Sequence, residues 1–109
     1  MNPTGQRLVL DNEHVRVWLD IVAPGEEQPV HTHESPYLSV MLTDANAQVV
    51  DADGTVLYDV ERSPGDATWF GPDRVPVTHT LRNTGDAEIR VAIVEVLDRQ
   101  KLDAERGQP

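Results

Sequence analysis

The stretch from Gly25 to Asn46 reads GEEQPVHTHESPYLSVMLTDAN, and the rest of the chain is best understood from it. It places His31 and His33 one residue apart, directly ahead of an apolar run typical of a β-strand. Side chains i and i+2 of a strand point to the same face, so both imidazoles of an extended segment share one face. Imidazole is the commonest metal-binding side chain. The pair therefore predicts two ligands of a metal ion, which still needs a third ligand and a closed scaffold.

The composition limits the class of protein. We expect residues 1–109 to form a single domain with one modest core. Only 39% of residues are apolar and 5% aromatic, so that core is expected to consist of Val, Leu and Ile. A net charge of −10 disfavours nucleic acid and anionic membranes as partners. The absence of cysteine excludes disulfides, thiolate catalysis and Cys-based zinc sites. Without a signal-peptide pattern or a membrane-spanning apolar run, the expected location is the cytoplasm.

Short apolar runs separated by turn signals predict an all-β fold. The barrel core is expected over about residues 8–97, with 1–7 and 98–109 as flexible or dimer-contact extensions. The expected strands cover residues 8–10, 14–22, 37–42, 47–50, 55–58, 67–70, 77–81 and 88–97.

Three of these segments carry finer predictions. Alternation in 14–22 places two sets on opposite faces: Val15, Val17, Leu19 and Ile21 against Arg16, Trp18 and Asp20. The strand 88–97 is apolar on both sides, which predicts burial of both faces or a subunit contact. Asp53-Gly54, between 47–50 and 55–58, predicts a hairpin with a type I′ turn.

His79 lies on the later expected strand 77–81 and is the candidate third ligand. Strands distant in sequence become neighbours in a closed antiparallel sheet, so His79 can face the His31–His33 pair across the barrel interior. Three nitrogen ligands leave coordination positions open, which is typical of a catalytic metal site. His14, at the start of a strand, is left outside the site.

With these residues in place, the chain resembles the small single-domain cupins over about residues 14–97. The first cupin motif begins with Gly, five residues and His-x-His, which Gly25, His31 and His33 match. The chain departs from the rest of that motif. Tyr37 or Leu38 stands where the motif glutamate falls, and Asp44 replaces the following glycine.

The second cupin motif ends in His-x3-Asn, which His79 to Asn83 match. Gly65 is a plausible start of that motif, although the segment 71–78 is longer than the motif by about two residues. The resemblance implies a cupin-type β-barrel, that is a double-stranded β-helix or jelly roll, commonly paired into a homodimer. It also implies a three-histidine metal shell without the usual glutamate, as in the thiol dioxygenase kind of cupin.

Tyr37 shares the face of His33 if the strand is regular, so its phenol can hydrogen-bond a water on the metal. We take Tyr37 as the candidate catalytic residue. The alternative is an aromatic at the barrel mouth with its hydroxyl in solvent. Glu34 is expected to point away from the site, and Gln28 lies on the approach loop, from which it can reach inward.

The expected function is metal binding, as a metal-dependent dioxygenase or isomerase acting on a small organic acid or thiol. The metal is a divalent transition metal, with Fe, Zn, Ni, Mn and Cu all open. Arg74 and Arg82 can hold a substrate carboxylate, or can simply balance the surface aspartates. A non-catalytic module that binds a small ligand or metal, and a structural barrel without metal, are the alternatives.

Overall fold

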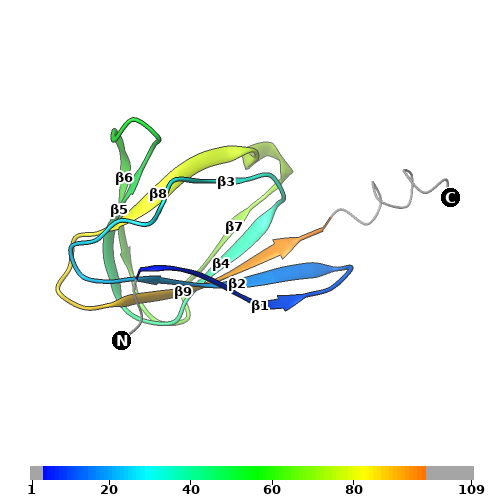
Figure 1. Cartoon of the computed structure of the whole chain (residues 1–109), viewed down its shortest axis with the longest axis horizontal. Helices are drawn as coiled ribbons and strands as arrows, with labels where there is room; N and C mark the ends of the chain where they lie inside the picture. Colours follow the sequence, from blue (N-terminus) through cyan, green and yellow to red (C-terminus); the bar gives the residue numbers. More distant parts are fainter. Residues whose placement is uncertain (1–3, 98–109) are drawn as a thin grey trace, which may run out of the picture.

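The computed structural model describes residues 4–97, which form two antiparallel sheets packed face to face (Figure 1). One sheet has five strands in the order β1-β2-β9-β4-β7, and the other has four in the order β3-β8-β5-β6. The strands are β1 (Gly5–Asp11), β2 (Val15–Val22), β3 (His31–His33), β4 (Tyr37–Met41), β5 (Ala45–Val50), β6 (Val56–Arg62), β7 (Ala67–Phe70), β8 (Val77–Asn83) and β9 (Ile89–Val96).

The all-β prediction is confirmed. The strand β3 is absent from the expected set, and the other strands differ from the expected bounds mainly at their ends. Residues 5–7 belong to β1, an edge strand, so this part of the expected extension 1–7 is ordered. The expected tail 98–109 lies outside the described residues. The only helical element within 4–97 is a single 3₁₀ turn, Pro72–Arg74, and this part of the chain has no helix long and apolar enough to cross a membrane.

The hairpin predicted at Asp53-Gly54 is present, but its type I′ turn is not. A type I′ turn needs positive φ at both central residues. Gly54 has φ 92°, whereas no residue other than glycine within 4–97 has a positive φ. The Gly54 N–H donates to the carbonyl of Asp51 at 3.2 Å, and the Asp51 N–H donates to that of Thr55 at 2.9 Å. The longer loop needs left-handed backbone only at Gly54, where it costs no steric strain.

The core lies between the sheets and is built mainly from aliphatic side chains of β2, β4, β5 and β9. On β9 the inward residues Ile89, Val91 and Ile93 are buried. The outward residues Ala92 and Val94 are only half-buried. The prediction that both faces of this strand are buried is therefore wrong within one chain, and the subunit-contact alternative stays a prediction.

The orientation of β2 is opposite to what its alternation suggests. Val22 is fully buried and Trp18 packs against the core, while Asp20 on the same face is only 3% exposed. Val17 and Leu19, which the sequence pattern favours as a core face, are half-buried on the outer side. The outer face of this sheet is itself apolar, so alternation alone cannot distinguish it from the inner face. As a result, a carboxyl group points into the barrel.

Candidate metal centre

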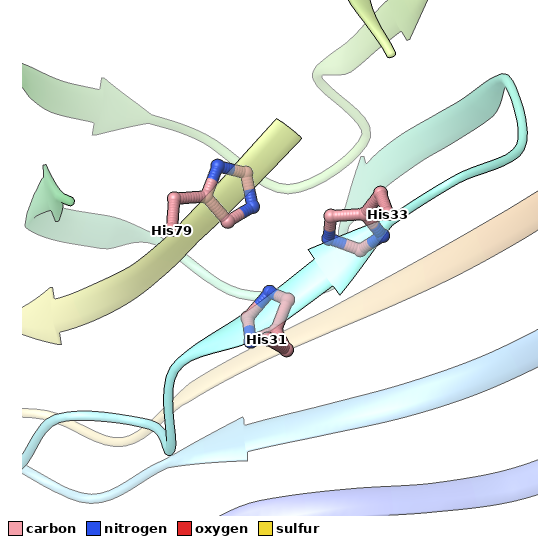
Figure 2. Close-up of side chains that lie close together, drawn as sticks. All are labelled: His31, His33 and His79. Atoms are coloured by element: carbon pink, nitrogen blue, oxygen red, sulfur yellow. The ribbon is translucent and has the colours of Figure 1, made fainter. Parts of the chain in front are cut away.

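The three predicted ligands come together because β3 pairs directly with β8. His31 stands opposite His79 in the antiparallel register, and His33 lies two residues further along the same face. The ring centroids are 4.7 Å apart for His31 and His33, and 5.0 Å apart from His79 to each of them. One nitrogen donor from each ring lies within 4.8 Å of the others, and Figure 2 shows the rings around one common space.

The predicted convergence of His31, His33 and His79 is confirmed, although its route differs. The sequence predicts a position for His79 across the barrel interior from the other two histidines. It is instead the cross-strand neighbour of His31 in the same four-stranded sheet. The distances between the rings thus follow from strand spacing rather than from the width of the barrel.

The protonation of the cluster suits a metal ion. Nδ1 of His31 donates to the Pro29 carbonyl at 3.0 Å, so Nε2 is the nitrogen of this ring that can bind a metal. Burial, together with the neighbouring imidazoles, lowers the pKa of His33 to about 3. Burial and His31 lower the pKa of His79 to about 4. Both rings are therefore neutral at pH 7, and neutral imidazoles are the form that binds divalent transition metals.

The histidines form part of the wall of a cavity of about 230 Å³ between the two sheets. This volume is below the 300–1,000 Å³ typical of sites for drug-sized ligands, which indicates a small ligand. Much of the wall is aliphatic. The polar groups besides the histidines come from Asp20, Gln28, Tyr37, Ser39, Tyr58, Arg62, Thr68, Arg74 and Thr80.

Tyr37 lies inside the cavity rather than at its mouth. It is 2% exposed, and its ring stacks on His33 at 4.0 Å and on Phe70 at 4.4 Å between centroids. Its hydroxyl is buried and has no hydrogen-bond partner among the described residues 4–97. Burial raises the pKa of Tyr37, so the phenol keeps its proton at neutral pH. The alternative of a hydroxyl in solvent is therefore wrong. Glu34, as expected, is exposed and does not line the cavity.

The cavity includes polar residues that the sequence analysis did not select. Asp20 and Arg62 both line the cavity, although the strand pattern alone gives no reason to place either of them there. Arg74 lines the cavity as proposed, whereas Arg82 lies outside it and pairs with Glu27 at 3.0 Å. The signal for Asp20 was a carboxyl group in the middle of a strand, which becomes informative only once the inner face is known.

Asn83 joins the ends of the two sequence motifs. Its backbone carbonyl accepts the N–H of Gly25 at 3.1 Å, where Gly25 has φ 75°. Its buried side-chain amide donates to the carbonyls of Val22 and Ala87, at 3.0 and 2.8 Å, and its Oδ1 accepts the Gly85 N–H at 2.9 Å. These bonds hold the loop before β3 against the end of β8, and so help to set the histidine strands in place.

Comparison with solved structures assigns the fold. The chain is similar to a cupin domain from Bordetella pertussis Tohama I, with a TM-score of 0.72 and 23% identity over 90% of this chain and 99% of that one. It is also similar to an RmlC-like cupin family protein with a double-stranded β-helix fold from Methanocaldococcus jannaschii (TM-score 0.66, 15% identity, 90% and 84% covered). A third similar structure is a sugar phosphate isomerase from a cupin superfamily, from Silicibacter pomeroyi DSS-3. Its TM-score is 0.54 and its identity 22%, over 79% of this chain and 52% of that one.

The chain therefore has the cupin fold, a double-stranded β-helix. Within that fold, the cluster of three imidazoles is a candidate metal centre of the kind that the sequence predicted, without the motif glutamate. No family model matches the sequence, and no curated protein matches it.

Proposed function

We propose that this chain is a metal-dependent enzyme of the dioxygenase-like kind that acts on a small organic acid or thiol. The observation that carries the proposal is the cluster of three imidazoles in the wall of a cavity. His31, His33 and His79 would hold a divalent transition metal (Fe, Zn, Ni, Mn or Cu), which supplies Lewis-acid or oxygen-activating chemistry when bound. Three neutral ligands leave the metal's double positive charge in place, which favours an anionic substrate.

Two arginines support an acid rather than a thiol as the substrate. Arg62 and Arg74 line the cavity, and neither has an ion-pair partner among residues 4–97. The Arg74 guanidinium lies 4.4 Å from the centroid of the Phe70 ring, which holds it at the cavity. Cationic groups without acidic partners are unexpected in a chain with a net charge of −10. A ligand carboxylate is a suitable counter-ion for them.

Tyr37 is the residue that we propose to act on the bound substrate. Its ring is held between His33 and Phe70, and its buried hydroxyl retains its proton. It can therefore act as the donor of a hydrogen bond to an oxygen of a ligand that reaches it.

Isomerisation is a second candidate. The similar protein from Silicibacter pomeroyi is described as a sugar phosphate isomerase, and this chain spans 52% of its length. Unpaired arginines also suit a phosphate group. The non-enzymatic alternative is a protein that binds a small ligand or metal without converting it. Tight binding of a ligand without formation of product would favour this alternative.

The test is metal loading followed by turnover. Protein purified without an affinity tag is expected to contain about one divalent metal per chain by elemental analysis. Anaerobic reconstitution with Fe(II), followed by oxygen-uptake assays on small acids and thiols, is expected to give turnover. Isomerase activity is tested with Zn(II) or Ni(II) in place of Fe(II), and the products are identified by mass spectrometry.

The matched variants are His79→Ala and His14→Ala. His14 is the one histidine of the chain outside the cluster, and it is exposed. His79→Ala should lose most of its metal, while His14→Ala should retain it. Tyr37→Phe should keep both metal and stability but lose most of the turnover, since it removes only the hydroxyl. Equal metal content in both alanine variants, or no turnover with any divalent metal, would overturn the proposal.

A further inference from the structure

The cavity contains a second polar site beside the imidazoles, formed by Asp20 and Gln28. Asp20 extends from β2 and is 3% exposed, and Gln28 lies just before β3 and is 4% exposed. Both side chains line the cavity. Buried polar groups are costly unless they are satisfied, so a pair of them facing a cavity calls for an explanation.

The backbone of Gln28 is fixed on both sides, which sets this residue in the cavity wall. Its backbone N–H donates to the Leu81 carbonyl at 3.0 Å, and its carbonyl accepts the hydroxyl of Thr80. Its side-chain Nε2 is buried and has no hydrogen-bond partner within ordinary geometry among residues 4–97. The amide lies close enough to the Asp20 carboxylate to lower its pKa. Since an amide nitrogen carries two N–H groups, Gln28 keeps at least one donor for a ligand oxygen.

Asp20 supplies the complementary acceptor. One carboxyl oxygen accepts a hydrogen bond from Nε2 of Gln6 at 3.1 Å, which holds the side chain in place. Burial raises the pKa of Asp20, while Gln28, Gln6 and the nearby His31 oppose this rise. Two of these groups, Gln28 and His31, line the cavity with Asp20. The carboxyl group is therefore located on the side of the cavity where the imidazole cluster lies.

We propose that Asp20 and Gln28 form a subsite that binds a hydroxyl group of the ligand. A hydroxyl is both donor and acceptor, so it can donate to the carboxylate and accept from the unused amide. Thiols and unsubstituted alkyl groups make poor partners for either group. The ligand class that follows is a small hydroxylated organic acid, and the acid part of this inference rests on the proposed function.

The test compares matched acids that differ only in one hydroxyl. Lactate and propionate, malate and succinate, and 3-hydroxybutyrate and butyrate are titrated by calorimetry into protein loaded with Zn(II). In at least one pair the hydroxylated acid is expected to bind about tenfold tighter or more, because the analogue leaves buried polar groups unpaired. In Gln28→Leu and Asp20→Ala that preference should fall to about threefold or less.

The controls are Gln48→Leu and Asp59→Ala, which change the same residue types outside the cavity. Both should keep the preference of the parent protein. Gln28→Leu replaces an unsatisfied buried amide with an apolar side chain of similar size, so it is expected to fold even if Asp20→Ala does not. Equal affinities within every pair, or a preference that persists in Gln28→Leu, would refute the subsite.

Elemental analysis of the same samples separates this result from the metal proposal. Protein that holds metal but shows no hydroxyl preference refutes the subsite alone. Protein that takes up no metal refutes the proposed function. The affinities of the paired acids are then compared on the metal-free protein, in which Asp20 and Gln28 line the same cavity. The same affinity ratios, about tenfold in the parent and threefold or less in the variants, then decide whether the subsite exists.

Discussion

His33 is the most buried residue of the histidine cluster. It is 7% exposed and its ring stacks on Tyr37. The ring centroids of the other two histidines lie 4.7 and 5.0 Å from its own. Each of these surroundings disfavours a second proton on the ring, because a charged imidazole loses its hydration and repels its neighbours. The sequence places a histidine at this position, but the size of the decrease in its pKa depends on the fold.

This burial predicts a pH dependence of stability in metal-free protein. The pKa values of His33 and His79 fall from 6.5 in the unfolded chain to about 3 and about 4 in the folded chain. Below pH 6.5 the unfolded state therefore binds more protons, so the free energy of unfolding should decrease as the pH falls from 6.5 to about 4. Each histidine contributes on the order of 1 kcal/mol per pH unit to this slope.

Urea denaturation of chelator-treated protein at several pH values measures this slope. Carboxylates also titrate in this range, so the informative quantity is the difference between the parent and His79→Asn. The variant should show a shallower loss of stability on acidification, while the exposed control His14→Asn should match the parent. Identical slopes in the parent and His79→Asn would contradict the lowered pKa.

Among the elements, β8 connects the site to the scaffold. Its first half pairs with β3 and carries His79, and its second half pairs with β5 and ends at Asn83. The side chain of Asn83 makes three hydrogen bonds to backbone groups and is 1% exposed. The strand thus sets the position of the ligands at one end and is fixed by a buried amide at the other.

Asn83→Ala should destabilise the protein by about 2–3 kcal/mol, because it leaves buried backbone groups without partners. Denaturant unfolding measures the change, and Asn46→Ala, on the exposed side of β5, is the matched control with an expected effect below about 0.5 kcal/mol. A loss in Asn83→Ala no larger than in the control would show that these hydrogen bonds are not needed.

The outer face of the five-stranded sheet bears on oligomeric state. The strand registers place Val17, Val94, Leu38 and Trp69 in one row across β2, β9, β4 and β7. Trp69 is 51% exposed. We propose that a second copy of the chain covers this face, since an apolar surface lets two acidic chains meet without placing like charges in contact.

Light scattering should then report a dimer for the parent and a monomer for Val94→Glu. The control is Val56→Glu, an exposed apolar residue on β6 in the other sheet, which should remain a dimer. A monomeric parent at micromolar concentration would remove the homodimer prediction. A charge on an apolar interface costs several kcal/mol, so an unaffected Val94→Glu dimer would place the interface elsewhere.

At the scale of the whole molecule, the cavity differs from the exterior. The chain has a net charge of −10, yet two arginines without acidic partners among residues 4–97 line the cavity. The interior also combines an aliphatic wall with a few buried polar groups. Such a cavity favours a small anion with a specific hydrogen-bonding group over a purely apolar ligand.

Local patterns predicted several features of this molecule correctly. Turn signals and β-branched runs indicated the strands, since chain reversal and pleated packing depend on nearby residues. The His-x-His spacing placed two imidazoles on one face, because the side-chain period of a strand is two. His79 was a candidate because it lies on a later expected strand of a closed sheet, and the motif resemblance supported it, since nothing local links it to residues 31 and 33.

The strand content, the three imidazoles and the missing motif glutamate follow from the residue types in the chain and their local spacing. The position of His79 beside His31, the inward orientation of Asp20 and the unpartnered amide nitrogen of Gln28 follow only from the fold. Each of these three facts depends on strand pairing between distant segments. Alternation shows which side chains share a face, but burial against the opposite sheet decides which face becomes the inside.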